Sequence, residues 1–355
     1  MKNKKLLILS KYSNKGASSR LRTLQYIPYI ESSGFSVVTS SLFDDDYLNS
    51  LYRKKRVSIS KLVKYYIKRL SIVLTAFRFD LILIEKEAFP YLPSFFEALI
   101  RLSRKPYILD YDDAIFHNYD LHRNVFVRQL LGGKLLGLIK NSTAVMVGNS
   151  YLSDYIVCHG SLRTEILPTV IDLSRYTVQP IIFDGTLRIG WIGTPATVKY
   201  LRLLWPALEI ISKNMKVKLI TIGACDIVDC PVPIEQYQWS INEENQLISL
   251  IDVGVMPLPD DPWANGKCGY KLIQYMACGR PVIASPVGVN KNIVDPDIGF
   301  LAADTYDWCD AFKYFYENPS KLNSFGLMGR KKVESHYNST IIASKMISLF
   351  HDAAS

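Results

Sequence analysis

The sequence lacks any apolar run long enough to cross a membrane as a helix. A spanning helix needs about 18 consecutive uncharged apolar residues, and the chain of 355 residues contains no such stretch. The amino terminus reads MKNKKLLILS and has a basic tip, but its apolar run ends at Leu9. That run is too short for the core of a signal peptide. We therefore predict that these residues form a first buried strand.

Cysteine is scarce, and its spacing suits neither a zinc site nor a disulfide framework. The six cysteines form no CxxC pair, and only Cys158 has an adjacent histidine, His159. One such pair is too little for a zinc site, and the pattern fits a reducing compartment. We expect a cytoplasmic protein whose cysteines remain thiols.

The composition is that of a globular protein with an uneven charge distribution. Hydrophobic residues make up 48% and charged residues 21% of the chain, and its length suits two domains of roughly 150–200 residues. Residues 1–170 hold 25 Lys and Arg against 14 Asp and Glu, whereas the remainder holds 17 against 19. The asymmetry predicts that the first half faces a membrane, a nucleic acid or a phosphorylated acceptor.

Short β-branched runs alternate with helical patterns along the chain, which is typical of βαβ units and parallel sheets. We predict strands over Lys5–Leu9, Ser36–Thr39, Leu81–Glu85, Tyr107–Asp110, Ala144–Gly148, Glu165–Leu167, Leu187–Ile192, Lys216–Ile222, Glu235–Gln238, Val253–Pro257 and Pro281–Ala284. The predicted helices include Ser19–Ser33, Ser60–Phe77, Val198–Asn214, Asn242–Ile251, Lys271–Cys278 and Thr305–Glu317.

Periodicity is lost over residues 168–185, which contain two prolines. We predict an N-terminal acceptor domain over 1–170, a linker over 171–186, a donor domain over 187–335, and a last helix within 336–355 that packs back on the first domain. The fold class is α/β, with two doubly wound domains facing a cleft. Such domains bind ligands at the carboxyl ends of their strands.

One candidate phosphate site follows the strand LRIGWIG. Gly193 permits close approach of the backbone, and Thr194 or Thr197 is placed to cap a helix that contains Lys199. The free amides and the positive end of that helix would suit a phosphate. An ordinary capped helix after a buried strand remains the alternative.

A second candidate site lies in the segment GKCGYK, after the strand DVGVMPLP. Gly266 and Gly269 supply flexible backbone, while Lys267 and Lys271 supply charge at the start of a short helix that also contains Tyr270. Lysines at a helix amino terminus oppose the helix dipole, so their presence indicates a nearby anion. Solvated lysines are the alternative.

The N-terminal half has its own polar turns. Gly16, Ser19 and Arg20 lie in a small-residue turn at a helix start, where a cation again indicates an anion; a flexible surface loop is the alternative. Asp112 and Asp113 follow the strand PYILD, and either could orient or deprotonate an acceptor hydroxyl. Helix capping by Asp113 is the alternative. Glu85 follows a neighbouring strand and is a second-rank candidate.

A basic segment spans residues 53–70, with eight Lys and Arg among positions 53–69. Leu62, Val63, Tyr66, Ile67 and Leu70 are expected to share the other face of the helix. A basic amphipathic helix of this kind predicts contact with a membrane surface. A solvated helix face is the alternative, and no nucleic-acid-binding module accompanies the segment.

The motifs together resemble a known enzyme family. KLIQYMACGRPVIASPVG, preceded by IGWIGTP and LPTVID, resembles the retaining glycosyltransferase family 4 of GT-B fold. The opening GASSRLRTLQYIPYIESSGF resembles bacterial members that build surface polysaccharides. The resemblance implies retaining transfer of a sugar from a nucleoside diphosphate donor, which is a co-substrate, without a metal or cofactor. The literal DxD at Asp110–Asp112 is therefore not expected to bind metal.

The sequence departs from that family at two donor positions. The family carries two glutamates eight residues apart, and Gly266 and Gln274 stand in their places. Gln274 can still hydrogen-bond a ribose. The family's diphosphate arginine corresponds to Thr194, whereas its lysine corresponds to Lys199. Lys199 and the turn with Lys267 and Lys271 are the residues that we expect to stabilise the leaving diphosphate.

The function that we predict is sugar transfer, from a UDP-sugar in the first instance, to a lipid-linked saccharide on the inner face of the bacterial membrane. Without an evident nucleophile, the resemblance favours front-face attack in which the leaving phosphate takes the acceptor proton. The rivals are a sugar-nucleotide epimerase of the same fold and a non-catalytic nucleotide-sugar binder. The sugar, the linkage and the oligomeric state are not specified by the sequence.

Overall fold

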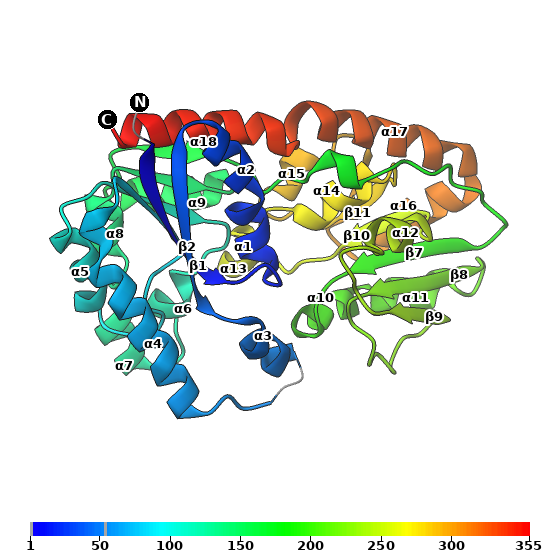
Figure 1. The fold of residues 1–355 in the computed structure, drawn as a ribbon. Helices are drawn as coiled ribbons and strands as arrows, with labels where there is room; N and C mark the ends of the chain where they lie inside the picture. The colour runs from blue at the N-terminus through cyan, green and yellow to red at the C-terminus, as the bar shows by residue number, and fades with distance from the viewer. Residues whose placement is uncertain (1–2, 53–54) are drawn as a thin grey trace. The chain divides into compact units, whose positions relative to one another are not determined.

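The structure is a computed structural model that describes residues 3–52 and 55–355 (Figure 1). Its contacts divide the chain into two compact units. Unit 1 consists of Met1–Thr169, Gly266–Cys268 and Thr340–Ser355, and unit 2 consists of Val170–Asn265 and Gly269–Ser339.

Unit 1 is built on a six-stranded parallel sheet of order β2-β1-β3-β4-β5-β6. β3, β4 and β5 are buried along their whole length, because helices cover both faces of a doubly wound sheet. The strands are β1 (Lys4–Tyr12), β2 (Phe35–Phe43), β3 (Leu81–Glu85), β4 (Tyr107–Tyr111), β5 (Ala144–Val147) and β6 (Thr164–Ile166).

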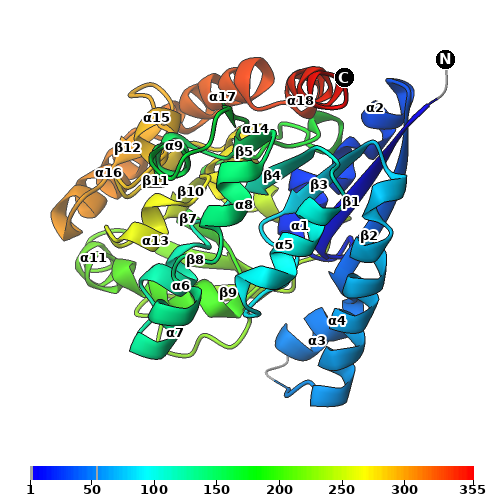
Figure 2. The same ribbon diagram turned by 90° about the vertical axis from the view of Figure 1, so that its left-hand side faces the viewer.

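The helices of unit 1 lie on both faces of its sheet. α4, α5 and α8 lie side by side, and their apolar residues join one buried cluster with β1, β3, β4 and β5 (Figure 2). The helical elements are α1 (Ala17–Arg22), η1 (Leu24–Tyr26), α2 (Ile27–Ser32), α3 (Asp45–Tyr52), α4 (Ile59–Leu74), η2 (Ala76–Arg78), α5 (Ser94–Leu102), α6 (His117–Asp120), α7 (Val125–Leu131), α8 (Leu136–Asn141), α9 (Ser150–Cys158) and α18 (Ser339–Ala353). α18 belongs to this unit from Thr340 onward, and its Phe350 contacts Phe35 of β2 edge-on.

Unit 2 contains a second six-stranded parallel sheet, of order β12-β11-β10-β7-β8-β9. α11 and α16 pack on one buried cluster of this unit and α14 on another. The strands are β7 (Leu187–Ile192), β8 (Val217–Ile222), β9 (Ile234–Tyr237), β10 (Val253–Met256), β11 (Val282–Ala284) and β12 (Gly299–Leu301). The helical elements are η3 (Leu173–Arg175), η4 (Pro195–Thr197), α10 (Val198–Leu201), η5 (Arg202–Leu204), α11 (Trp205–Ile211), α12 (Glu244–Ser249), α13 (Pro262–Asn265), α14 (Tyr270–Ala277), α15 (Asn290–Ile293), α16 (Thr305–Glu317) and α17 (Pro319–His336).

The strand pattern agrees with the sequence, whereas two long helices do not. All eleven predicted strands are present, and β12 is an additional strand. The helix predicted over residues 19–33 is wrong as a single element, because η1 interrupts it and α2 starts anew with Pro28 in its first turn. Pro206 likewise begins α11, so residues 198–214 form a series of short elements.

The residues predicted as a linker pack into unit 2. Ile171, Tyr176 and Ile181 are buried in its apolar clusters. Asn323 of α17 also holds Ile181 by hydrogen bonds to both its amide and its carbonyl.

Candidate functional site

Each sheet has one topological switch point, a strand on whose two sides the neighbouring strands are added. In unit 1, β1 lies between β2 and β3, and in unit 2, β7 lies between β8 and β10. Crevices at the carboxyl ends of such strands are the usual ligand sites of doubly wound sheets. Ser19 and Glu85 lie at the first of these points, Gly193 and Lys271 lie at the second, and Asp113 and Lys267 meet beyond the end of β4.

Glu85 closes the turn at the switch point of unit 1. Its buried carboxylate accepts hydrogen bonds from the hydroxyl groups of Ser18 (2.9 Å) and Ser19 (2.6 Å), and from the amide of Lys11 (3.1 Å). Burial raises the pKa of Glu85 above its usual value. Ser19 and Glu85, which the sequence suggested separately, are therefore in direct contact. In this structure Glu85 fixes the turn from Gly16 to Arg20.

Asp112 and Asp113 share one lysine that the sequence did not single out. The ammonium of Lys86 lies 2.9 Å from Asp112 Oδ1 and 3.3 Å from Asp113 Oδ2. Burial would raise the pKa of Asp112, but Lys86 and Arg22 outweigh it and lower that pKa to about 2. A carboxylate so stabilised is a weak base. Asp113, whose side chain is 25% exposed against 13% for Asp112, is the better candidate to meet an acceptor hydroxyl.

Lys267 has a carboxylate partner within unit 1. Its ammonium lies 2.8 Å from Asp113 Oδ1, and its carbonyl accepts from the side-chain amide of Asn149 (3.0 Å). Burial lowers the pKa of Lys267, but Asp113 outweighs it and the pKa is raised. The anion that this lysine indicated is thus supplied by the protein. Asp113 does not cap a helix, since the nearest one, α6, follows Phe116.

Cys268 and Gly266 fit tightly into unit 1 on either side of Lys267. Cys268 Sγ donates to the carbonyl of Asp112 (2.8 Å), and burial raises the pKa of this thiol to about 12. A Cβ at position 266 would lie 2.6 Å from Ala114 Cβ and 2.8 Å from its backbone nitrogen. A glutamate, which the family that the sequence resembles carries here, would have no room in this arrangement. The glycine is explained by close packing.

Gly266→Ala is expected to destabilise unit 1 by about 1–3 kcal/mol, because the added methyl group overpacks the contact with Ala114. The matched control is Gly137→Ala in α8, where nothing lies within 4 Å of the added Cβ. The control should instead stabilise the protein by about 0.5–1 kcal/mol. Urea denaturation of both variants measures the difference, and equal midpoints would show that residue 266 is not packed as described.

The buried pair Arg22–Asp110 was missed from the sequence. The guanidinium binds both carboxylate oxygens of Asp110, with Nε 3.1 Å from Oδ2, and Nη1 donates to the carbonyl of Leu167. Both side chains are at most 2% exposed. This pair joins α1 to β4, whereas Arg20, the arginine that was predicted, donates to the carbonyl of Asn14 near the surface.

A second buried ionic cluster holds the loop that follows β3. Lys134 is fully buried; its ammonium lies 2.5 Å from Glu87 Oε2 and from the carbonyl of Phe89, and 3.5 Å from Glu97 Oε1. Glu97 accepts in turn from the amide of Phe89 (2.9 Å). The hydroxyl of Tyr119 donates to Glu87 at 2.8 Å. No sequence spacing indicated this cluster, because its members come from three distant segments.

The basic segment 53–70 differs from its prediction in two ways. Arg69 is buried and donates to the carbonyl of Ser10, so it does not face outward. The apolar residues expected on one face are divided: Val63 and Ile67 are exposed, whereas Tyr66 and Leu70 pack on the core. Arg53 and Lys54 lie outside the described residues.

In unit 2, the turn after β7 contains Gly193, Thr194 and Lys199. A Cβ at Gly193 would lie 2.4 Å from the ring of Trp191, so packing requires the glycine. The predicted capping is wrong: neither Thr194 nor Thr197 makes a side-chain cap, and Thr197 Oγ1 donates to the carbonyl of Thr194 instead. The helices here are also short, which weakens the dipole argument. Lys199 is exposed beside the ring of Tyr200.

The helix α14 is fixed against the end of β7. The amide of Ile192 donates to the hydroxyl of Tyr275 (2.7 Å), and Lys271 Nζ lies 4.6 Å from the ring centroid of Trp191. Gly269 begins the helix with φ +65°, a conformation that favours glycine. The structure thus places Lys271 of α14 beside Trp191, near the carboxyl end of β7 and the turn that contains Gly193.

Two further predicted donor residues are less exposed than expected. Gln274 is only 4% exposed, and Tyr270 packs partly against the apolar cluster under α14. Sequence reasoning missed Trp191, whose ring contacts Lys271; the available signal was its position two residues before Gly193, near the end of a buried strand.

Two searches of the described residues gave negative results. Within residues 3–52 and 55–355, no group of three or more His, Cys, Asp or Glu side chains is placed to hold a metal ion. No helix in the same part of the chain is both long and apolar enough to cross a bilayer.

Comparison with known proteins places the donor motifs within a recognised domain. Residues 186–318 match the family model described as glycosyl transferases group 1. These residues include the turn at Gly193 and the helix α14. No curated protein sequence matches the chain.

The fold of the whole chain is shared with solved structures. Sucrose-phosphate synthase from Thermosynechococcus elongatus is 16% identical, with a TM-score of 0.73 over 99% of this chain and 100% of that one. Anabaena HepE in complex with UDP and glucose is 14% identical, with the same TM-score and coverage. A glycosyltransferase from Rickettsia africae is 10% identical, with a TM-score of 0.73 and 99% of both chains covered. These likenesses confirm the predicted GT-B fold class of two Rossmann-like units.

Proposed function

We propose that the chain is a glycosyltransferase that uses a nucleoside diphosphate sugar, with a UDP-sugar as its donor. The observation that carries the proposal is the position of Lys271 at the carboxyl end of β7, inside the segment that matches the group 1 family model. The structure of HepE with UDP and glucose supports the choice of nucleotide. The transferred group in this proposal is a hexosyl or N-acetylhexosaminyl residue.

The proposed reaction retains the anomeric configuration and needs no metal ion or cofactor. The bond between the anomeric carbon and the diphosphate oxygen breaks, the acceptor oxygen bonds to that carbon on the same face, and the acceptor proton passes to the leaving phosphate. Negative charge develops on the diphosphate, and fixed cations near it lower the barrier. In unit 2 Lys199 and Lys271 take this role, and Gln274 contacts the ribose.

The acceptor in this proposal is a lipid-linked saccharide of bacterial polysaccharide assembly, met on the inner face of the cell membrane. The excess of basic residues in residues 1–170 supports an anionic partner. Asp113 is the carboxylate best exposed to orient the acceptor hydroxyl.

The test begins with thermal shifts measured over a panel of nucleoside diphosphate sugars, since a ligand of the folded state raises its apparent stability. The stabilising donor is then incubated with a lipid extract from polysaccharide-producing bacteria, and the product's anomeric configuration is determined by NMR. An inverted product would refute retention. Conversion of the donor in the absence of any acceptor would identify an epimerase instead.

Gly266 also favours a second candidate, a nucleotide-sugar binder without catalysis. Its contact with Ala114 leaves no space for the acidic side chain that the related family has at this position. Tight donor binding without transfer to any lipid-linked acceptor would support this candidate over the enzyme.

A further inference from the structure

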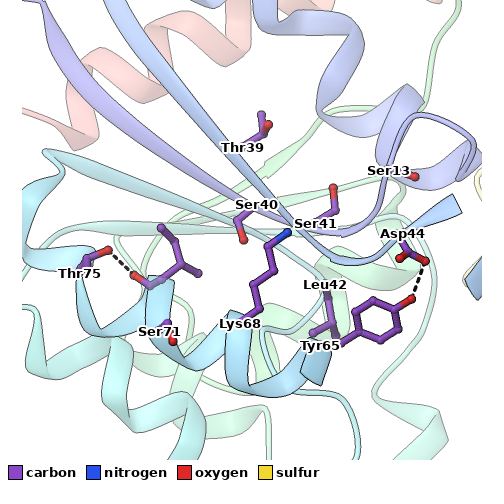
Figure 3. A pocket seen from close by; sticks show the side chains of 11 residues that line it. Ser13, Thr39, Ser40, Ser41, Leu42, Asp44, Tyr65, Lys68, Ser71 and Thr75 are labelled. Carbon is purple, nitrogen blue, oxygen red and sulfur yellow. Dashed lines mark hydrogen bonds between the residues drawn. The ribbon is translucent and has the colours of Figure 1, made fainter. Parts of the chain in front are cut away.

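A pocket of about 570 Å³ lies in unit 1 between the edge strand β2 and the helix α4 (Figure 3). Its volume is within the range of small-molecule sites. Seven of its eleven lining residues carry hydroxyl groups. It is separate from the ionic cluster around Asp113, and no predicted donor or acceptor residue lines it.

Lys68 gives this pocket its charge. Its side chain extends from α4 toward Ser40 and Ser41 of β2 (Figure 3). Among the described residues, Lys68 makes no ion pair and no side-chain hydrogen bond. Ser40 pairs in register with Leu9 of β1, whose side chain packs in the same buried cluster as Val73 of α4, so the Ser40 side chain is on the face of β2 toward the helix. An ammonium group and the Ser40 hydroxyl, which share the space between β2 and α4, are suited to the oxygens of an anion.

The one acidic residue of the pocket is already engaged. Asp44 Oδ1 accepts from the hydroxyl of Tyr65 (2.5 Å) and from the amide of Tyr47 (2.9 Å). The dashed bond between Asp44 and Tyr65 in Figure 3 lies away from the Lys68 amine. The Lys68 end of the pocket is therefore positive, and a neutral sugar would leave that charge without a partner.

The outer surface of α4 indicates where the anion comes from. The helix contains no acidic residue. Ile59, Val63 and Ile67 are 79%, 49% and 57% exposed, and they recur every four residues. At about 100° per residue they form one aliphatic row. The exposed lysines Lys64 and Lys68 lie next to this row, on the side toward the pocket.

That arrangement matches the layers of a membrane surface. An aliphatic row suits the boundary of the acyl chains, and adjacent lysines suit the level of the phosphates. The pocket opens beside the lysines, where a phosphate headgroup would be.

We propose that the pocket between β2 and α4 binds the phosphate group of an anionic membrane phospholipid. Lys68 is its counter-ion, Ser40 donates a hydrogen bond to it, and the aliphatic row of α4 enters the bilayer. The inference deepens the proposed function, on which it rests for the membrane location of the acceptor.

The test compares binding of the full chain to vesicles of phosphatidylcholine alone and to vesicles that also contain phosphatidylglycerol, by sedimentation. Lys68→Gln is compared with Lys64→Gln, which removes the same charge from the same helix outside the pocket. Lys64→Gln should weaken binding to anionic vesicles about fivefold, the effect of one lysine near the surface. Lys68→Gln should weaken it on the order of fiftyfold, because a charge-assisted hydrogen bond is lost as well.

A second variant tests the space rather than the charge. Ser71→Leu, at an exposed position of α4 that lines the pocket, should fill it and reduce the preference for anionic vesicles to that of Lys68→Gln. Equal losses for Lys64→Gln and Lys68→Gln would overturn the proposal in favour of a diffuse basic surface. Equal binding to both kinds of vesicle would overturn it as well.

Soluble anions separate the two sources of phosphate. Glycerol 3-phosphate and inorganic phosphate should not displace the protein from vesicles at concentrations where the lipid phosphate is limiting. Displacement by either would show that the pocket takes a free phosphate and would overturn the lipid assignment. Thermal shifts with UDP-sugars are measured in parallel. A donor shift without vesicle binding rejects this inference alone, whereas vesicle binding without a donor shift rejects the proposed function alone.

Discussion

Lys134→Met is expected to destabilise unit 1 by about 3–5 kcal/mol, because it leaves buried carboxylates without their counter-ion. Lys134 is fully buried between Glu87 and Glu97, and it also donates to the carbonyl of Phe89. For a unit of this size the loss corresponds to a fall of roughly 10 °C in Tm. Differential scanning calorimetry measures it, and the unit 2 transition should not move.

The effect has a defined pH dependence. Burial raises the pKa of Glu97 even with Lys134 present, and removal of the lysine raises it further. A carboxyl group whose pKa is raised by folding favours the folded state at low pH and opposes it at high pH. The variant should therefore recover stability as the pH falls from 8 toward 5. The triple variant Lys134→Met, Glu87→Gln, Glu97→Gln should show little of this pH dependence, and a pH-independent loss in the single variant would contradict the ionic explanation.

Lys271→Ala is expected to lower kcat for sugar transfer by about 10²–10³-fold, the usual effect of removing one group that stabilises developing negative charge. It should also weaken donor binding about 10–150-fold, since a hydrogen bond from a charged group is lost. Single-turnover transfer and calorimetric titration with the donor measure the two effects separately.

Lys321→Ala is the matched control for Lys271→Ala. Lys321 is an exposed lysine of α17 in the same unit, and its removal changes the charge equally. Its donor affinity and rate should equal those of the wild type. If Lys271→Ala binds and transfers as well as this control, the diphosphate does not lie at the amino terminus of α14.

Elements with strong local signals were predictable from the sequence. Strands such as Leu81–Glu85 begin with a continuous apolar run, and burial on both faces of a parallel sheet leaves few other ways to place such a run. The position of Gly193 follows from local order, because its turn comes directly after a buried strand, whereas Lys271 reaches the end of β7 only through the packing of α14. Helix continuity was less predictable, since Pro28 and Pro206 start new helices within apparently continuous patterns.

The charge partners were not predictable, because they depend on the register of distant strands. Lys267 meets Asp113 across 154 positions of sequence, and Arg22 meets Asp110 across 88. The dipole argument indicated an anion near Lys267, but it could not distinguish a protein carboxylate from a ligand phosphate. Whether Lys267 also serves the donor stays a prediction.

Cys268 offers a chemical probe of how tightly residues 266–268 pack within unit 1. Its thiol is 9% exposed, donates to the carbonyl of Asp112, and has its pKa raised by burial to about 12. Only on the order of one such thiol in 100,000 is ionised at neutral pH, and the thiolate is the form that alkylating reagents attack. Cys158, by contrast, is exposed. After Cys158 has been blocked or replaced, the slow rate of Cys268 alkylation would measure how often residues 266–268 detach from unit 1. A change of that rate on binding of a donor or an acceptor would show that the ligand is coupled to this segment.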